Sequence, residues 1–284
     1  PNVGLVTSEL GASTTFGVVL ATQPLFNVVV TLVSSNTGEG RVDTDTGTVG
    51  LQSALTFNPS NWNNPQTVTL TGVDDLVDDG DVGYSISDSI STSDSKYTGV
   101  AASTLDVGVS NLDNDTAAFI INPASGLVVQ ESSGTATFTI LLATQPTVDV
   151  TLNLSSSDVT SGTVSPSVLS FSSVSGGGNG WDVPHVVTIT GAPNGFVDGN
   201  RAFQIITDVP GTNTDPAYKV LNPTDVNGIV SDDDVAAVVV DGDANGAGQR
   251  ILRQLQRLQK FLQQNFANHG DRQQVRFARL SGSR

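Results

Sequence analysis

Branched apolar residues and polar residues alternate along short stretches of this chain, as they do in strands that bury one face. Such stretches include Thr15–Leu20, Val28–Leu32 and Thr67–Thr71, and Gly, Asn, Ser, Asp and Pro cluster between them. No helical periodicity appears before residue 248. This pattern predicts an all-β chain, built from immunoglobulin-like antiparallel β-sandwiches of about seven strands each.

Near-identical strings divide the chain into modules. LATQP at Leu20–Pro24 recurs at Leu142–Pro146, and VTLTG at Val68–Gly72 recurs as VTITG at Val187–Gly191. A period of about 119 residues is the length of a whole domain and too long for a solenoid repeat. We therefore predict module 1 at residues 1–116, module 2 at 117–235, a strand and turn at 236–247, and a basic amphipathic helix with a tail at 248–284.

The two ends of the repeat do not match. Pro1 aligns with Pro123, so module 1 is expected to lack an opening strand, whereas AAVVVD at 236–241 aligns with the opening strand of module 2. One interpretation is that the mismatch reflects only the boundaries of the given sequence. The other is strand donation, in which this segment of one subunit completes module 1 of the next and builds a filament head to tail. The interface residues would be Ala236, Ala237, Val238, Val239 and Val240.

The segment after residue 247 differs from the modules in pattern and in charge. Ile251, Leu255, Leu258 and Leu262 are spaced by four, three and four residues and form one apolar stripe, expected to be an interface. Residues 236–284 carry a formal charge of +5, against −12 for residues 1–116 and −9 for 117–235. Docking on the acidic modules is the first interpretation, a self-associating helix the second and a membrane-surface helix the third. No apolar run is long enough to predict a transmembrane segment.

Composition narrows the chemistry of the modules. Their acidity argues against nucleic-acid binding, and the absence of cysteine excludes disulfides and cysteine-bound zinc. Each module carries acidic residues at three stations, in module 1 Glu9, the loop 74–81 and the pair Asp113 and Asp115. Loops gather at the ends of a sandwich, crowded carboxylates repel one another, and Ca²⁺ takes six to eight oxygen ligands. Calcium is the favoured interpretation, and solvated turn aspartates are the alternative.

The acidic stations also carry a family resemblance. Thr7-Ser8-Glu9, the loop 72–81 and the closing residues 229–234 resemble Calx-β domains, and the stretches 58–62 and 215–218 are similar to bacterial versions of them. The resemblance covers about residues 1–240 and implies seven-stranded sandwiches with Ca²⁺ held at one end. The ligands that it implies are Glu9, Asp74, Asp75, Asp79, Asp113 and Asp115 in module 1, and Glu131, Asp198, Asp232, Asp233 and Asp234 in module 2.

Module 2 departs from this pattern in its middle loop. Pro193, Asn194 and Asn200 stand where module 1 has Asp74, Asp75 and Asp81. Because fewer charged ligands weaken calcium binding, we expect module 2 to bind Ca²⁺ less tightly or to hold fewer ions.

Catalytic signatures are missing from the sequence. The two histidines, His185 and His269, occupy unmatched positions, and neither a nucleophile elbow nor a phosphate loop appears. We therefore expect no enzyme activity. The favoured hypothesis is a calcium-stiffened structural protein of the bacterial cell surface that polymerises head to tail with itself. The alternatives are an adhesin or module that binds a cell-surface glycan or protein, and an accessory region of a larger secreted enzyme.

Overall fold

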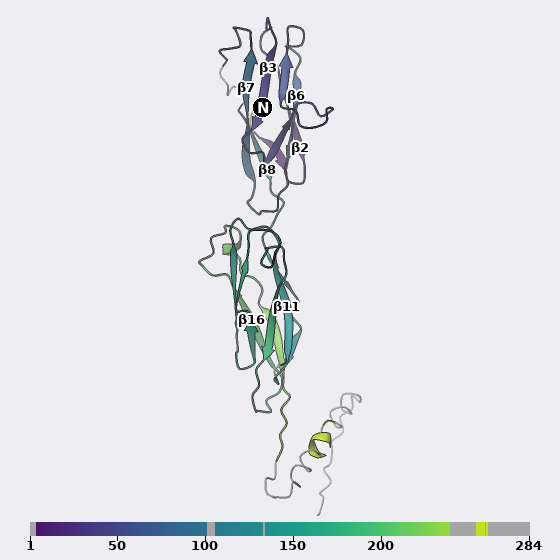
Figure 1. The fold of residues 1–284 in the computed structure, drawn as a ribbon, viewed down its shortest axis with the longest axis vertical. Coiled ribbons are helices and arrows are strands. Elements are labelled where there is room, and N and C mark those ends of the chain that lie inside the picture. Colours follow the sequence, from purple (N-terminus) through teal and green to yellow (C-terminus); the bar gives the residue numbers. More distant parts are fainter. Residues whose placement is uncertain (1–3, 101–105, 133, 239–253, 259, 261–284) are drawn as a thin grey trace, which may run out of the picture. The chain divides into compact units, whose positions relative to one another are not determined.

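The computed structural model describes residues 4–100, 106–132, 134–238, 254–258 and 260. Its regular structure is almost entirely β, in two sandwiches (Figure 1), as the alternating pattern predicted. By their internal contacts, residues 1–233 form one compact unit and residues 234–284 a second.

The first sandwich packs a sheet of five strands against a sheet of three. The five-stranded sheet has the order β1-β8-β7-β3-β5, and the three-stranded sheet has the order β2-β6-β4. The strands are β1 (Leu5–Ser8), β2 (Ser13–Val18), β3 (Val28–Ser34), β4 (Gly40–Asp43), β5 (Ala54–Phe57), β6 (Gln66–Gly72), β7 (Val82–Thr92) and β8 (Val107–Leu112).

The second sandwich repeats this arrangement and adds one strand. Its sheets have the orders β10-β17-β16-β12-β14 and β13-β15-β11-β9. The elements are β9 (Phe119–Asn122), β10 (Leu127–Gln130), β11 (Thr135–Leu142), β12 (Val150–Ser156), β13 (Gly162–Ser165), β14 (Val168–Phe171), β15 (His185–Gly191), β16 (Arg201–Asp208), the 3-10 helix η1 (Tyr218–Val220) and β17 (Val226–Ser231).

In each sandwich, two consecutive strands form one extended segment that is split between the two sheets. β1 pairs in parallel with β8, the chain turns at Gly11 (φ 79°), and β2 then pairs antiparallel with β6. β10 and β11 repeat this with β17 and β15. Seven strands per module were expected, and the described residues form eight strands in the first sandwich and nine in the second. The split segment counts as two strands, and β9 adds one to the second sandwich. The sandwiches are also not purely antiparallel, because each contains this one parallel pair.

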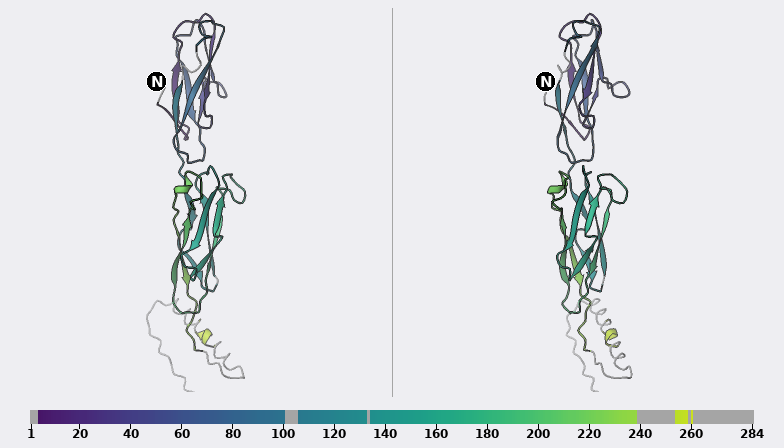
Figure 2. Two further views of the ribbon diagram at one scale, coloured as in Figure 1. Left: turned by 90° about the vertical axis from the view of Figure 1, so that its left-hand side faces the viewer. Right: turned by 60° about the vertical axis from the view of Figure 1, so that its left-hand side comes forward.

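Alternation along the strands builds the two cores, which lie between the facing sheets (Figure 2). Val28, Val30 and Leu32 of β3 are buried in the first core, while the residues between them are only half-buried. The tryptophans that precede β6 and β15 differ in burial. Trp181 is 7% exposed and belongs to the second core, whereas Trp62 is half-buried and packs against the margin of the first.

β9 closes an edge that is open in the first sandwich. It pairs with residues 139–142 of β11, and Phe119 packs edge-on against Tyr218 and Phe171, with ring centroids 5.5 and 6.1 Å apart. Among the described residues, no strand pairs with the matching edge of β2. A groove of about 350 Å³ lies there, lined by Val18, Leu20, Ile90 and Tyr97 among others. We call this groove the β2 groove.

Little of the C-terminal segment is described. Residues 254–258 and 260 are helical, and Leu255 and Leu258 are exposed. Ala236, Ala237 and Val238 carry no regular secondary structure. Val239, Val240, Ile251 and Leu262 lie outside the described residues. Within the described part of the chain, no helix has the length and apolarity needed to cross a membrane.

Candidate metal centre

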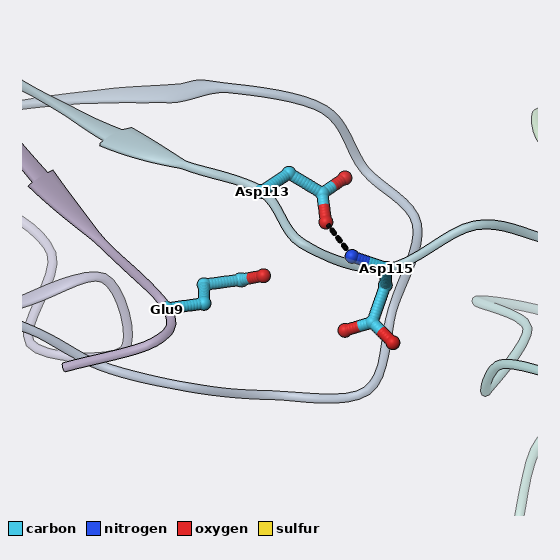
Figure 3. A group of neighbouring side chains, drawn as sticks. All are labelled: Glu9, Asp113 and Asp115. Atoms are coloured by element: carbon cyan, nitrogen blue, oxygen red, sulfur yellow. Dashed lines mark hydrogen bonds between the residues drawn. The ribbon is translucent and has the colours of Figure 1, made fainter.

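Three acidic segments of module 1 meet at one end of its sandwich, which we call the acidic end. Glu9 follows β1, and Asp113 and Asp115 follow β8. Because β1 and β8 run in parallel, their carboxyl ends lie side by side, with Ser8 opposite Leu112. Carboxylate oxygens of Glu9, Asp113 and Asp115 all lie within 4.8 Å of one another (Figure 3). We call these three residues the first carboxylate group.

Backbone N–H groups hold the first carboxylate group in place. The Asn114 N–H donates to Glu9 Oε2 at 3.0 Å, and the Asp115 N–H donates to Asp113 Oδ1 at 2.7 Å. The Gly80 N–H, from the loop after β6, donates to Asp113 Oδ2 at 2.7 Å. Each aspartate and glutamate oxygen can accept more than one bond, so these contacts orient the carboxylates and leave lone pairs for a cation.

A second carboxylate group consists of Glu39, Asp75 and Asp79, with oxygens again within 4.8 Å of one another. Glu39 precedes β4 and is 6% exposed, and Asn111 Nδ2 donates to its Oε2 at 3.2 Å. The Val77 N–H donates to Asp75 Oδ1 at 2.8 Å. The sequence argument did not name Glu39. Its signal was available, since Glu39 is one of only three glutamates in the chain and directly precedes the glycine that starts β4.

Burial and mutual repulsion make the acidic end of module 1 costly to charge. Burial, together with the neighbouring Asp113 and Asp75, raises the pKa of Glu9 from 4.5 to about 7. Burial also raises the pKa of Asp79, with Glu39 the largest charge contribution, and the pKa of Asp115, with Asp113 the largest. A bound divalent cation would remove this cost, because it favours the ionised form of every carboxylate around it.

The donor set of module 1 fits a hard divalent cation. The two groups offer six carboxylates and no nitrogen or sulfur ligand, and Ca²⁺ prefers such oxygen ligands on loops. Glu9, Asp113 and Asp115 would hold one ion, and Glu39, Asp75 and Asp79 would hold another. The bound ions would supply charge neutralisation and would tie together the loops after β1, β6 and β8.

Three further acidic side chains of the loop after β6, those of Asp74, Asp78 and Asp81, lie outside both groups. Asp74 Oδ1 accepts a bond from Asn114 Nδ2 at 3.2 Å, so this predicted ligand lies beside the first group without belonging to it. Asp78 Oδ2 accepts a bond from the Ala117 N–H at 2.7 Å.

Among the residues that the structure describes, the acidic end of module 2 contains one group of three carboxylates, Glu131, Asp198 and Asp232. The predicted ligands Asp233 and Asp234 are not part of it. Glu131 is 1% exposed, and its Oε1 accepts bonds from Asn194 Nδ2 at 2.7 Å and from Arg201 Nη2 at 2.5 Å. Sequence reasoning did not single out Arg201. This end therefore fits a divalent cation less well than module 1, because a cationic side chain already lies against its buried carboxylate.

Comparisons with known proteins give fold-level similarity only. No protein-family model and no curated protein sequence matches the chain. Among solved structures, CBD12 from CALX1.2 aligns at 17% identity over 75% of this chain and 80% of that one, with a TM-score of 0.28. The calcium binding domain CBD12 of CALX1.1 aligns at 16% identity over 74% and 80%, with a TM-score of 0.27.

A second kind of neighbour comes from a surface layer. Domains 4 and 5 of the S-layer protein SbsC align at 14% identity over 54% of this chain and 65% of that one, with a TM-score of 0.26. Values this low say nothing about function, so the case for a metal rests on the carboxylates themselves.

Proposed function

We propose that this protein is a non-catalytic structural protein of the cell exterior, whose module 1 is stiffened by bound Ca²⁺. The two carboxylate groups at the acidic end of module 1, each containing a buried glutamate, carry this proposal. An extracellular setting would suit such sites, because weakly binding calcium modules work at the high calcium concentrations found outside cells.

Hydrogen bonds link the loop after β6 to two segments of module 2, its first residues and the loop after β11. The Ala117 N–H donates to Asp78 Oδ2, and the Gln145 N–H donates to the Leu76 carbonyl at 2.6 Å. The same loop supplies Asp75 and Asp79 to the second carboxylate group. Ions that order this loop would therefore also restrain the junction between the modules.

Calorimetric titration of the full chain with Ca²⁺ tests this proposal. We expect binding by the wild type, loss of the ion held by the first carboxylate group in Asp113→Asn, and no change in Asp45→Asn. Asp45 is a suitable control because its carboxylate is exposed and occupied by its own turn, accepting bonds from the Gly47 N–H and the Thr48 hydroxyl. Small-angle scattering should show a broader range of inter-module arrangements after chelation. Absence of calcium binding at millimolar concentration would refute the proposal.

We further propose head-to-tail assembly by strand donation, in which residues 236–240 of a second copy occupy the β2 groove. The groove supports this because it lies where β9 packs in module 2. Transferred to module 1, the register of β9 places Val238 opposite Leu20 and Val240 opposite Val18. In β9, the positions equivalent to Val238 and Val240 are half-buried, and the one equivalent to Val239 is exposed.

The difference in burial between these valine positions provides a matched pair of variants. Val240→Asp would place a charge in the groove and should abolish polymers, whereas Val239→Asp should leave them intact. Electron microscopy and sedimentation with Ca²⁺ give the readout, and a synthetic peptide of residues 234–243 should shorten wild-type polymers. A monomeric wild type would overturn this part of the proposal. Glycan binding by that monomer would favour the adhesin alternative, and a catalytic domain elsewhere in the full-length protein would favour the accessory role.

A further inference from the structure

At the acidic end of module 2, a positively charged side chain lies among oxygen atoms of the kind that bind a metal ion. Arg201, the first residue of β16, points its guanidinium at three oxygens. Nη2 lies 2.5 Å from Glu131 Oε1 and donates to the Thr160 carbonyl at 3.3 Å, and Nε lies 3.4 Å from Asp198 Oδ2. Two carboxylates and a backbone carbonyl are also the kinds of oxygen that surround Ca²⁺ in protein loops.

Module 1 has no such side chain at the matching position. Val82 starts β7 and lies opposite Asn111, as Arg201 starts β16 and lies opposite Val230, 119 residues further along both strands. The change from valine to arginine therefore adds one full charge at an equivalent place in the fold.

The second carboxylate group is largely lost in module 2 where the arginine is gained. Gly40 pairs with Gly72 and Gly162 pairs with Gly191, so Ser161 occupies the place of Glu39. Asn194 occupies the place of Asp75, and only Asp198 remains as the counterpart of Asp79. At the positions of the second carboxylate group, module 2 has thus exchanged two carboxylates for neutral side chains, and it has gained a cation at Arg201.

We propose that Arg201 is a built-in substitute for a divalent cation, which holds the acidic end of module 2 together without calcium. This inference rests on the proposed calcium dependence of module 1. A carboxylate buried to the extent of Glu131 needs a partner of opposite charge, and the guanidinium supplies it with hydrogen bonds in a fixed geometry. Arg201 also carries an elevated pKa, because of its bond to Glu131 and the nearby charge of Asp198, so it stays charged throughout the physiological range.

The guanidinium of Arg201 does not contact every carboxylate oxygen at this end. Glu131 Oε2 is buried without a hydrogen-bond partner among the described residues. Any Ca²⁺ that reached this oxygen would lie close to the guanidinium and would be repelled by it. Module 2 therefore keeps room for one weakly held ion at most, while its folding does not depend on it.

The two tryptophans allow this inference to be tested in the full chain. In a Trp62→Phe background, the only tryptophan is Trp181, which lies in the core of module 2. Its fluorescence therefore reports thermal unfolding of module 2 alone. We expect the same melting temperature in EDTA and in millimolar Ca²⁺. Arg201→Val introduces the residue that module 1 has at the equivalent position. This variant should lower the melting temperature in EDTA by roughly 5–10 °C, and calcium should restore most of the loss.

Lys219→Val provides the matched control. Lys219 is the other basic residue of module 2, and it is exposed on η1. Its replacement removes one positive charge at a site outside the acidic end, so it should create no calcium dependence. If Arg201→Val does not fold in EDTA, recovery of the transition on adding Ca²⁺ supports the inference.

A double variant covers the case in which Arg201→Val folds under neither condition. Arg201→Val with Glu131→Gln removes both charges and should fold without responding to calcium, and its failure to fold would overturn the inference. An Arg201→Val protein that melts equally in EDTA and in Ca²⁺ would also overturn it. Failure of the proposed function has a different signature, namely no calcium binding by calorimetry in the same Trp62→Phe protein.

Discussion

The carboxylate of Glu9 accepts a hydrogen bond from the backbone N–H of Asn114, a residue 105 positions later in the chain, at 3.0 Å. The contact exists because β1 pairs in parallel with β8, so the residues that follow both strands emerge at the same edge. It places a buried glutamate between Asp113 and Asp115. Several properties of module 1 should follow from this arrangement.

The first prediction concerns pH. In metal-free protein the pKa of Glu9 is about 7, whereas in the unfolded chain it takes its ordinary value near 4.5. Between these values the folded state binds more protons than the unfolded state, so the free energy of unfolding should fall as pH rises from about 5 to 7 and level off above that. Urea denaturation in EDTA at several pH values measures this slope.

Two comparisons make the pH dependence specific. Glu9→Gln should flatten the slope without removing it, because Asp79 and Asp115 also have raised pKa values. In saturating Ca²⁺ the trend should reverse below pH 7, since the ion requires ionised carboxylates and competes with protons. An unchanged slope in Glu9→Gln would contradict the assignment.

The second prediction concerns Glu39. Glu39→Gln keeps a carbonyl oxygen for the bond from Asn111 but removes one of the three charges of the second carboxylate group. Calcium affinity at this group should fall by about tenfold or more. In EDTA the same variant should melt at a higher temperature than the wild type, because less repulsion remains. Opposite effects with and without calcium distinguish a metal ligand from a merely structural glutamate, which would lose stability under both conditions.

The third prediction concerns Gly72, the last residue of β6. A Cβ at this position would lie 2.2 Å from the Ser8 carbonyl oxygen and 2.5 Å from Asn111 Oδ1. Gly72→Ala must therefore displace the end of β1 and with it Glu9, at a cost of roughly 1–3 kcal/mol of stability. Calcium affinity should fall as well. Gly83→Ala is the control, since a Cβ there meets no atom within 4 Å, and urea denaturation should separate the two variants.

The fourth prediction transfers the arginine of module 2 into module 1. In Val82→Arg the new guanidinium would start β7, as Arg201 starts β16. We expect it to pair with acidic side chains at this end and to reduce the number of calcium ions bound. The melting temperature of module 1 in EDTA should rise, because the added charge offsets carboxylate repulsion. Full calcium stoichiometry by calorimetry in Val82→Arg would show that the two acidic ends are not equivalent.

The sequence by itself determined the fold class, the two copies and the general place of the acidic ends. Successive side chains of a strand point to opposite faces of its sheet, so the alternation of apolar and polar residues in β3 and β6 identified the buried residues directly. The recurrence of VTLTG and LATQP fixed the module length. Loop positions of the aspartates followed from the turn residues around them. These are local signals, each contained within one strand or one turn.

Only the tertiary structure decided which carboxylates share a group. Six acidic residues of module 1 form two sets of three, and Glu39 joins the second set because β4 pairs with β6 beside the loop that carries Asp75 and Asp79. In module 2, the guanidinium of Arg201 reaches Glu131 across 70 residues of chain. Such proximities depend on strand pairing between distant segments, and no pattern within a short window encodes them, which is why both Glu39 and Arg201 escaped the sequence argument.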